Sequence, residues 1–226
     1  MDSVQALIWD VDGTLIDTAE QHYQAWVEFA RELGKPFTRQ NFTDTFGRRN
    51  PEIIRELFDP TADEALVAEW GERKEQLYRA KAAAGIDLLP GVRALLESAR
   101  DLGIPQAVGS SAPRANLDLL LKVTGTADFF QAIVSMEDTQ RGKPDPQVFL
   151  IAAQRLGVEP RRCVVLEDAV AGVQAAKAAG MLCVAVTFVG HHPAQRLRAA
   201  GADLVVPTLQ AVRLSRTGLS LVEPAG

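Results

Sequence analysis

Short apolar runs alternate with amphipathic stretches over most of the chain. The run at 4–9 ends at Asp10 and predicts a buried strand. Similar apolar runs occur at 104–108, 163–166 and 182–186, with weaker ones at 129–134 and 204–206. Helical periodicity lies between them, at 92–102, 114–123, 146–156, 169–179 and 193–200. Alternating strands and helices predict an α/β fold: a Rossmann-like, doubly wound parallel sheet with helices on both faces.

One region interrupts this alternation. Residues 18–85 contain helical pattern and no convincing strand, and an apolar stripe runs along 19–33. We therefore expect a small all-helical cap inserted after the first strand. The predicted boundaries are 1–16 and 88–226 for the α/β catalytic core and 17–87 for the helical cap. Residues after about 212 are weakly patterned, and we expect them to fray.

Composition narrows the class of protein. The chain has 226 residues, 47% of them hydrophobic, and a formal net charge of −5 without a basic run. This favours a globular enzyme with no nucleic-acid partner and no membrane partner. We expect a cytoplasmic location and a monomer. Cys163 and Cys183 lie in apolar runs and are expected to be buried thiols, and His191-His192 is interpreted as a surface pair.

A pair of aspartates follows the first predicted strand. In an extended segment, residues two apart point the same way, so Asp10 and Asp12 can reach one site. Open α/β sheets bind ligands at this carboxyl end of their strands. Gly13 allows a sharp turn and a close approach to an anion. Helix capping, the alternative role, would account for one of these acids and not for both.

Three further signals follow later strands. Ser110 and Ser111 precede a predicted helix, whose start suits a phosphate, although serine is common there in any case. Lys143 lies in a glycine- and proline-flanked loop that restricts its backbone. Glu167 and Asp168 end an apolar run, where helix capping is the simpler interpretation of either acid alone.

The order of these signals is more informative than any one of them. Four carboxylates at one site would repel each other and raise their pKa values. A divalent cation removes this problem, and a site of carboxylates, waters and a phosphate oxygen suits Mg²⁺.

The pattern resembles the haloacid dehalogenase superfamily of phosphatases and phosphomutases along essentially the whole chain. The residues that carry the resemblance are the segment 10–14, Ser110, Lys143 and the pair Glu167-Asp168. The helical insert is similar to the small cap of the branch that contains beta-phosphoglucomutase and phosphoglycolate phosphatase.

The resemblance implies roles for the core residues. Asp10 would be the nucleophile and Asp12 the general acid and base. Mg²⁺ would be bound by Asp10, the main-chain carbonyl of Asp12 and Asp168, with Glu167 acting through water. The phosphate would be held by Lys143, Ser110, Ser111, Val11, Gly13, Thr14 and Arg114.

In the cap, the resemblance extends to a hinge and to a set of substrate-binding positions. These are Thr18, His22, Gly47, Arg48, Arg49, Asn50 and Lys74. His22 has an alternative role as a hinge-packing residue, and the two arginines have one as solvated charges at a helix start. Asn50 stands where the mutases have a phosphate-binding arginine, and this departure argues against mutase activity.

Three functions remain open from the sequence. The first is a phosphatase that hydrolyses a small phosphorylated metabolite, such as a sugar phosphate. The second is a hexose-phosphate mutase of the beta-phosphoglucomutase type. The third is a phosphate-binding protein without turnover, which the retained nucleophile argues against, since binding alone does not require it.

Overall fold

The computed structural model describes residues 4–45, 48–215 and 218–221, and it divides into two compact units. One unit comprises residues 1–17 and 86–226, and the other comprises residues 18–85. Each unit has its own architecture. Among the described helices, none is long and apolar enough to cross a membrane.

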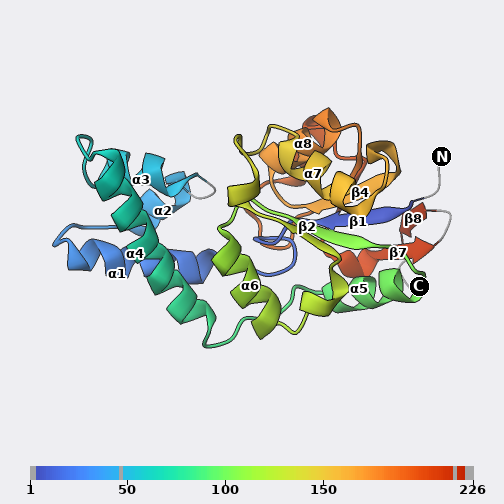
Figure 1. The fold of residues 1–226 in the computed structure, drawn as a ribbon, viewed down its shortest axis with the longest axis horizontal. Coiled ribbons are helices and arrows are strands. Elements are labelled where there is room, and N and C mark those ends of the chain that lie inside the picture. The colour runs from blue at the N-terminus through green and yellow to red at the C-terminus, as the bar shows by residue number, and fades with distance from the viewer. Residues whose placement is uncertain (1–3, 46–47, 216–217, 222–226) are drawn as a thin grey trace. The chain divides into compact units, whose positions relative to one another are not determined.

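The larger unit is built on a parallel sheet (Figure 1). Its strands are β1 (Ala6–Trp9), β2 (Gln106–Gly109), β3 (Ala132–Val134), β4 (Cys163–Glu167), β5 (Leu182–Val186) and β6 (Leu204–Val206). They lie in the order β3-β2-β1-β4-β5-β6, and every neighbouring pair is parallel. The chain therefore reverses its direction of winding at β1, which is the central switch point where such folds bind ligands.

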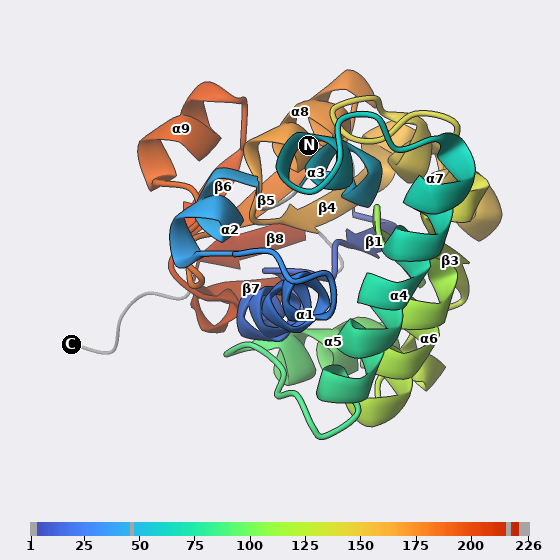
Figure 2. The ribbon, with the colours of Figure 1, turned by 90° about the vertical axis from the view of Figure 1, so that its left-hand side faces the viewer.

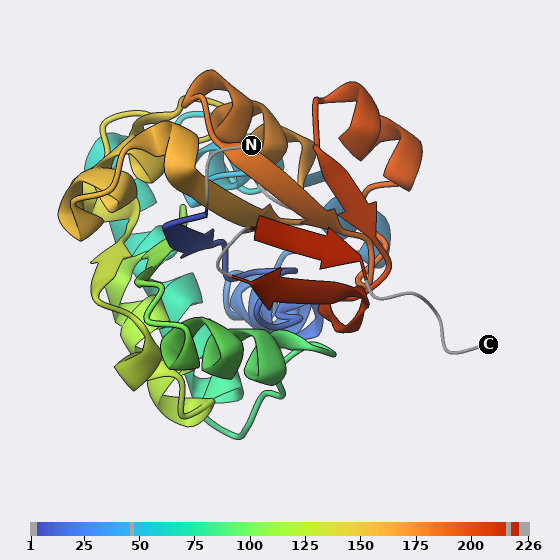
Figure 3. The same cartoon turned by 90° about the vertical axis from the view of Figure 1, so that its right-hand side faces the viewer.

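Helices cover both faces of this sheet, as in a doubly wound fold. They are α5 (Val92–Asp101), α6 (Arg114–Val123), α7 (Gln147–Leu156), α8 (Val170–Ala178) and α9 (Ala194–Ala199). Helices α5 and α6 lie on one side and α7 and α8 on the other (Figure 3). The strands β1 and β4 are buried along their whole length, which explains their nearly continuous apolar sequence.

In the described part of the larger unit, the connections contain four short 3₁₀ helices and a separate antiparallel hairpin. The 3₁₀ helices are η1 (Ala127–Phe129), η2 (Met136–Asp138), η3 (Pro160–Arg162) and η4 (Leu209–Ala211). The hairpin pairs β7 (Val212–Ser215) with β8 (Gly218–Leu221). For residues 212–215 and 218–221 the expectation of fraying was wrong, because the two segments pair with each other and β7 contacts α5. The other residues after 212 lie outside the described part of the chain.

The smaller unit is entirely helical over its described residues (Figure 2). It contains α1 (Ala19–Glu32), α2 (Arg39–Thr45), α3 (Asn50–Leu57) and α4 (Glu64–Ala82). Asp63 accepts a hydrogen bond from the Leu66 amide and so begins α4 with a side-chain cap. The core is aromatic: Trp26 and Phe29 of α1 pack on Phe58, with ring centroids 5.7 and 5.3 Å away.

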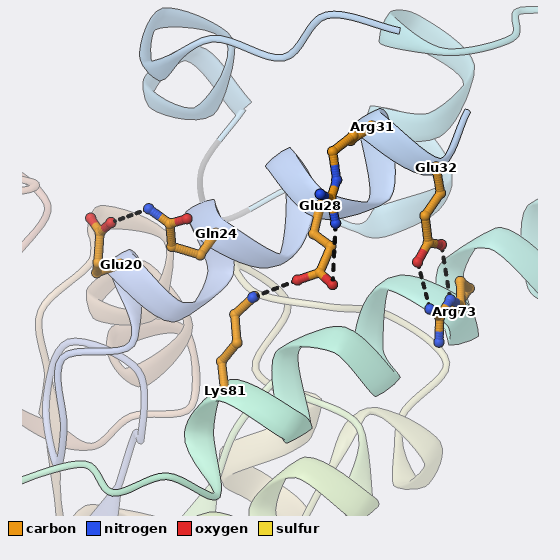
Figure 4. A network of polar contacts seen from close by, with 7 residues as sticks. All are labelled: Glu20, Gln24, Glu28, Arg31, Glu32, Arg73 and Lys81. Atoms are coloured by element: carbon orange, nitrogen blue, oxygen red, sulfur yellow. Dashed lines mark hydrogen bonds and ion pairs between the residues drawn. The ribbon is translucent and has the colours of Figure 1, made fainter. Parts of the chain in front are cut away.

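Ion pairs also join α1 to α4 (Figure 4). Lys81 donates to Glu28 at 2.6 Å, and Arg73 binds both carboxylate oxygens of Glu32 at 2.5 and 2.9 Å. These groups are partly exposed, so water screens the pairs and their contribution to stability is small. We therefore expect the buried aromatic core to contribute more to the stability of this unit.

Candidate active site

The parallel sheet brings the predicted core residues to one edge. Asp10 directly follows β1, Ser110 follows β2, and Glu167 is the last residue of β4. The register pairs Trp9 with both Val108 and Leu166, so these three strands end at the same level. The geometry agrees with the prediction that the polar residues after each strand converge.

Three of these residues form a buried carboxylate cluster. Asp10, Glu167 and Asp168 each offer an oxygen within 4.8 Å of the others, and all three are buried. Among the described residues this is the one group of acids, cysteines or histidines arranged to hold a metal ion. Hard carboxylate oxygens at this spacing fit a divalent cation. The carboxylate of Asp12 is outside the cluster, and its proposed carbonyl ligand remains a prediction.

The protonation of the cluster reflects its burial. Burial raises the pKa of Asp10 to about 7, Lys143 opposes this rise, and the charges of Glu167 and Asp12 add to it. Burial likewise raises the pKa of Asp168 well above its usual value, with further contributions from Glu167 and Asp10. Carboxyls that resist ionisation when together are stabilised as carboxylates by a nearby cation, which again fits a metal.

Lys143 bridges two of the acids. Its Nζ donates to Asp10 Oδ1 at 2.6 Å and to Glu167 Oε1 at 2.7 Å. Burial alone would lower the pKa of this amine, but the two carboxylates raise it above its usual value. The ammonium also lies 4.8 Å from the centroid of the Phe149 ring, a cation–π contact from α7 that sequence reasoning missed.

Glu167 fixes the loop between β4 and α8 and also belongs to the cluster. Its Oε2 accepts hydrogen bonds from the amides of Asp168 at 2.7 Å and Ala169 at 2.6 Å. Both residues precede α8, so Glu167 does not cap this helix. One carboxylate oxygen holds the loop, and the other accepts from Lys143.

Gly13 lies against the carboxylate of Asp168, and its close approach to a bound anion remains a prediction. Its φ is +88°, and a Cβ there would lie 2.2 Å from Asp168 Oδ2. A side chain at this position would therefore be strained and would also displace a carboxylate of the cluster. The neighbouring Thr14 is buried, and its Oγ1 has no hydrogen-bond partner among the residues that the structure describes.

The candidates after β2 differ in their surroundings. Ser110 is buried, and its Oγ accepts a hydrogen bond from the Ala112 amide at 3.1 Å. Arg114 begins α6, and its amide donates to both carboxylate oxygens of Glu137, while its guanidinium pairs with Asp118 at 2.8 Å. The phosphate-binding roles of Ser111, which is exposed, and of Arg114 remain predictions.

In the helical unit, three of the predicted residues meet around an acid that sequence reasoning missed. Glu75 Oε1 accepts from Lys74 Nζ and from Asn50 Nδ2, each at 2.8 Å. Lys74 Nζ also lies 2.8 Å from His22 Nδ1, and the His22 ring stacks on Tyr78 with centroids 3.9 Å apart. Burial, followed by the charge of Lys74, lowers the pKa of His22 well below its usual value.

The remaining candidates in the helical unit differ in their exposure, and one falls outside the described residues. Arg48 forms ion pairs with Glu52 at 3.3 Å and Glu56 at 2.7 Å, and Arg49 is exposed. Thr18 is buried, whereas Gly47 lies outside the described residues. The i+4 and i+8 spacing of the two glutamates after Arg48 was the sequence signal for its pairing.

The two cysteines and the adjacent histidines His191 and His192 lie outside the carboxylate cluster. Cys163 and Cys183 are buried free thiols, as predicted. His191 and His192 are half-buried rather than fully exposed, and burial lowers the pKa of each.

Comparison with known proteins agrees with this arrangement. The sequence pattern of the family described as "Hydrolase: haloacid dehalogenase-like hydrolase" matches residues 4–180. Beta-phosphoglucomutase of Bacillus subtilis is 34% identical over 211 residues, covering 90% of this chain and 89% of that protein. Fructose-1-phosphate phosphatase YqaB of Escherichia coli is 36% identical over 183 residues, covering 80% of this chain and 95% of that protein.

A solved structure extends the comparison to three dimensions. The HAD hydrolase, family IA, variant 3, of Entamoeba histolytica superposes with a TM-score of 0.86 at 26% identity, covering 93% of this chain and 96% of that chain. The chain belongs to the haloacid dehalogenase-like hydrolase family.

Proposed function

We propose that this phosphoric monoester hydrolase is a Mg²⁺-dependent phosphatase that releases phosphate from a small sugar phosphate through an aspartyl phosphate on Asp10. The observation that carries the proposal is the convergence of Asp10, Glu167, Asp168 and Lys143 at one sheet edge. A nucleophile, a cation site and a fixed positive charge are the parts that phosphoryl transfer requires. The names of two relatives, a sugar-phosphate phosphatase and a sugar-phosphate mutase, support the substrate class.

The proposed metal ligands come from the carboxylate cluster and its neighbour. Asp10, Asp168 and the main-chain carbonyl of Asp12 would bind Mg²⁺, and Glu167 would act through water. A bound Mg²⁺ offsets the negative charge of the carboxylates and of the phosphoryl group, so that the two can approach.

The proposed reaction has two displacement steps at phosphorus. A carboxylate oxygen of Asp10 forms a bond to phosphorus in line with the leaving oxygen, whose bond to phosphorus breaks as Asp12 gives it a proton. Asp12 then accepts a proton from a water that attacks the aspartyl phosphate, which releases phosphate and regenerates Asp10. Lys143 and Ser110, with main-chain amides near Val11 and Ser111, would hold the equatorial oxygens.

Contacts within the helical unit favour hydrolysis over mutase activity. A mutase must bind a second phosphate firmly while it keeps water from the aspartyl phosphate. Two of the three cationic candidates, Arg48 and Lys74, already have anionic partners: Arg48 pairs with Glu52 and Glu56, and Lys74 with Glu75. Asn50, at the position of the mutase arginine, cannot provide the bidentate charged contact of a guanidinium.

The proposal is tested by measuring phosphate release from a panel of sugar phosphates and related monoesters. We expect turnover in Mg²⁺, loss of turnover in EDTA, and recovery when Mg²⁺ is restored. Full activity in chelator at neutral pH would contradict the mechanism. Absence of turnover on every ester, with the fold intact, would instead favour a phosphate-binding protein.

A second assay separates phosphatase from mutase. Beta-glucose 1-phosphate is supplied with a trace of the 1,6-bisphosphate, and both free phosphate and glucose 6-phosphate are measured. We expect phosphate and little glucose 6-phosphate. Rapid bisphosphate-dependent isomerisation with negligible phosphate release would show that the enzyme is a mutase.

A further inference from the structure

Gly172 has an unusual position for a glycine. It lies inside α8, in the segment Val170-Ala-Gly-Val-Gln-Ala-Ala-Lys-Ala178, where alanine is otherwise common. Its φ is not in the positive range that favours glycine, so the backbone conformation would accept alanine. Alanine would also be the better helix former, since glycine is the least favourable residue after proline. Backbone geometry therefore does not account for this residue.

The neighbouring side chain of Glu167 explains why position 172 is a glycine. A Cβ built at this position would lie 1.7 Å from Glu167 Oε1 and 1.9 Å from Glu167 Cδ. No covalently unconnected atoms can be this close. The carboxylate of Glu167 thus occupies the volume that any other residue at position 172 would fill with its own side chain.

The same carboxylate is buried and accepts hydrogen bonds on both of its oxygens. Glu167 is 1% exposed, its Oε2 accepts from two amides in the loop before α8, and its Oε1 accepts from Lys143. Both oxygens therefore have fixed partners, and a buried carboxylate moved away from them would lose charge-assisted hydrogen bonds. A methyl group at 172 would displace this carboxylate, and the displacement would break at least one of these contacts.

We propose that Gly172 is a positioning residue of the active site: its missing side chain creates the space that holds Glu167 against Lys143 and within the carboxylate cluster. Gly172 touches no reacting atom and acts only through Glu167. The inference rests on the proposed function in so far as the cluster is the Mg²⁺ site. Its geometric part, the collision between position 172 and Glu167, is independent of any activity.

A double-mutant cycle tests the inference on the full-length protein. The variants are Gly172→Ala, Glu167→Ala and the two combined, with Gly71→Ala as the matched control. Gly71 is also a helical glycine, but the heavy atom nearest to its added Cβ lies at an ordinary 3.8 Å. Two quantities are measured: the Kd for Mg²⁺ by calorimetry on metal-free protein, and the Tm in EDTA.

We expect Gly172→Ala to raise the Kd for Mg²⁺ by about 10- to 100-fold, the usual effect of losing a residue that orients a metal site. In the Glu167→Ala background, Gly172→Ala is expected to cause no further loss of Mg²⁺ affinity, because the carboxylate with which the new methyl group would collide is absent. In EDTA, Gly172→Ala should lower the Tm of the wild type but maintain or raise the Tm of Glu167→Ala. Gly71→Ala should bind Mg²⁺ as the wild type does.

Two results would overturn the inference: wild-type Mg²⁺ affinity in Gly172→Ala, or equal losses from this change in both backgrounds. If Gly172→Ala does not fold, the combined variant decides. A folded combined variant supports the collision with Glu167, and an unfolded one refutes it. The Tm comparison uses neither metal nor substrate. Its result therefore tests the collision at position 172 even if the protein proves not to be a phosphatase.

Discussion

Replacing Asp10 by asparagine removes a buried carboxyl whose pKa the protein raises to about 7 from a usual 3.8. The folded state therefore holds this proton more tightly than the unfolded state does. Stability from this group is complete below about pH 4 and is lost as the pH rises through about 7. The difference between the two pKa values corresponds to about 4 kcal/mol, of which about 3 kcal/mol is lost between pH 5 and pH 8.

Urea unfolding of the metal-free protein in EDTA measures this loss. We expect the free energy of unfolding of the wild type to fall by about 3 kcal/mol more than that of Asp10→Asn between pH 5 and pH 8, because asparagine does not titrate there. Removing the charge of Asp10 also relieves Asp168, whose raised pKa depends partly on it, and this enlarges the difference in the same direction. The same pH dependence in both proteins would refute this account of the cluster.

Mg²⁺ provides the complementary test on the wild type. A cation that binds the ionised cluster should restore stability at pH 8, by about 2.7 kcal/mol when its concentration is a hundred times the Kd. The gain should be smaller at pH 5, where protons compete for the same oxygens. A gain of equal size at both pH values would mean that Mg²⁺ binds elsewhere.

Four other substitutions test individual residues. Lys143→Met should lower kcat by about 100- to 1000-fold, as loss of one charge-stabilising donor does, whereas near-normal turnover would exclude a role for this ammonium in the reaction. Arg49→Ala or Lys74→Ala should reduce kcat/KM for the true substrate far more than for p-nitrophenyl phosphate, which has no distal group to bind; equal losses on both would indicate an effect on stability or core chemistry. Gly13→Ala, whose methyl group would meet Asp168, should weaken Mg²⁺ binding measured by calorimetry, and unchanged binding would argue against the tight packing of this turn.

Much of the fold could be predicted because the parallel strands are buried on both faces. Continuous apolar runs such as 163–166 mark these strands, and the polar residue after each run marks the edge where they end. The hairpin of β7 and β8 was missed because its short segments lack a continuous apolar run. Helix α2, only seven residues long, likewise has too little periodicity to be recognised.

The core of the site was easier to predict than its supports. Asp10, Lys143 and Glu167 are chemically conspicuous, and the sheet topology brings them together. Glu75 and Gly172 act through contacts that depend on packing. Glu75 accepts a hydrogen bond from Asn50, and Gly172 leaves space for Glu167 because it has no side chain. The one sequence signal for Gly172 was a poor helix former in an alanine-rich helix, which has no meaning until its neighbour is known.

The proposed aspartyl phosphate on Asp10 can be trapped by rapid acid quenching. The enzyme is mixed with Mg²⁺ and a sugar phosphate that it hydrolyses, and the reaction is quenched within one turnover. The protein is then digested, and its peptides are examined by mass spectrometry. We expect the wild type to carry a phosphoryl group on the Asp10 carboxylate. The Asp10→Asn variant should show neither this adduct nor turnover. A phosphoryl group on another residue, or substantial phosphate release by pure Asp10→Asn, would contradict this mechanism.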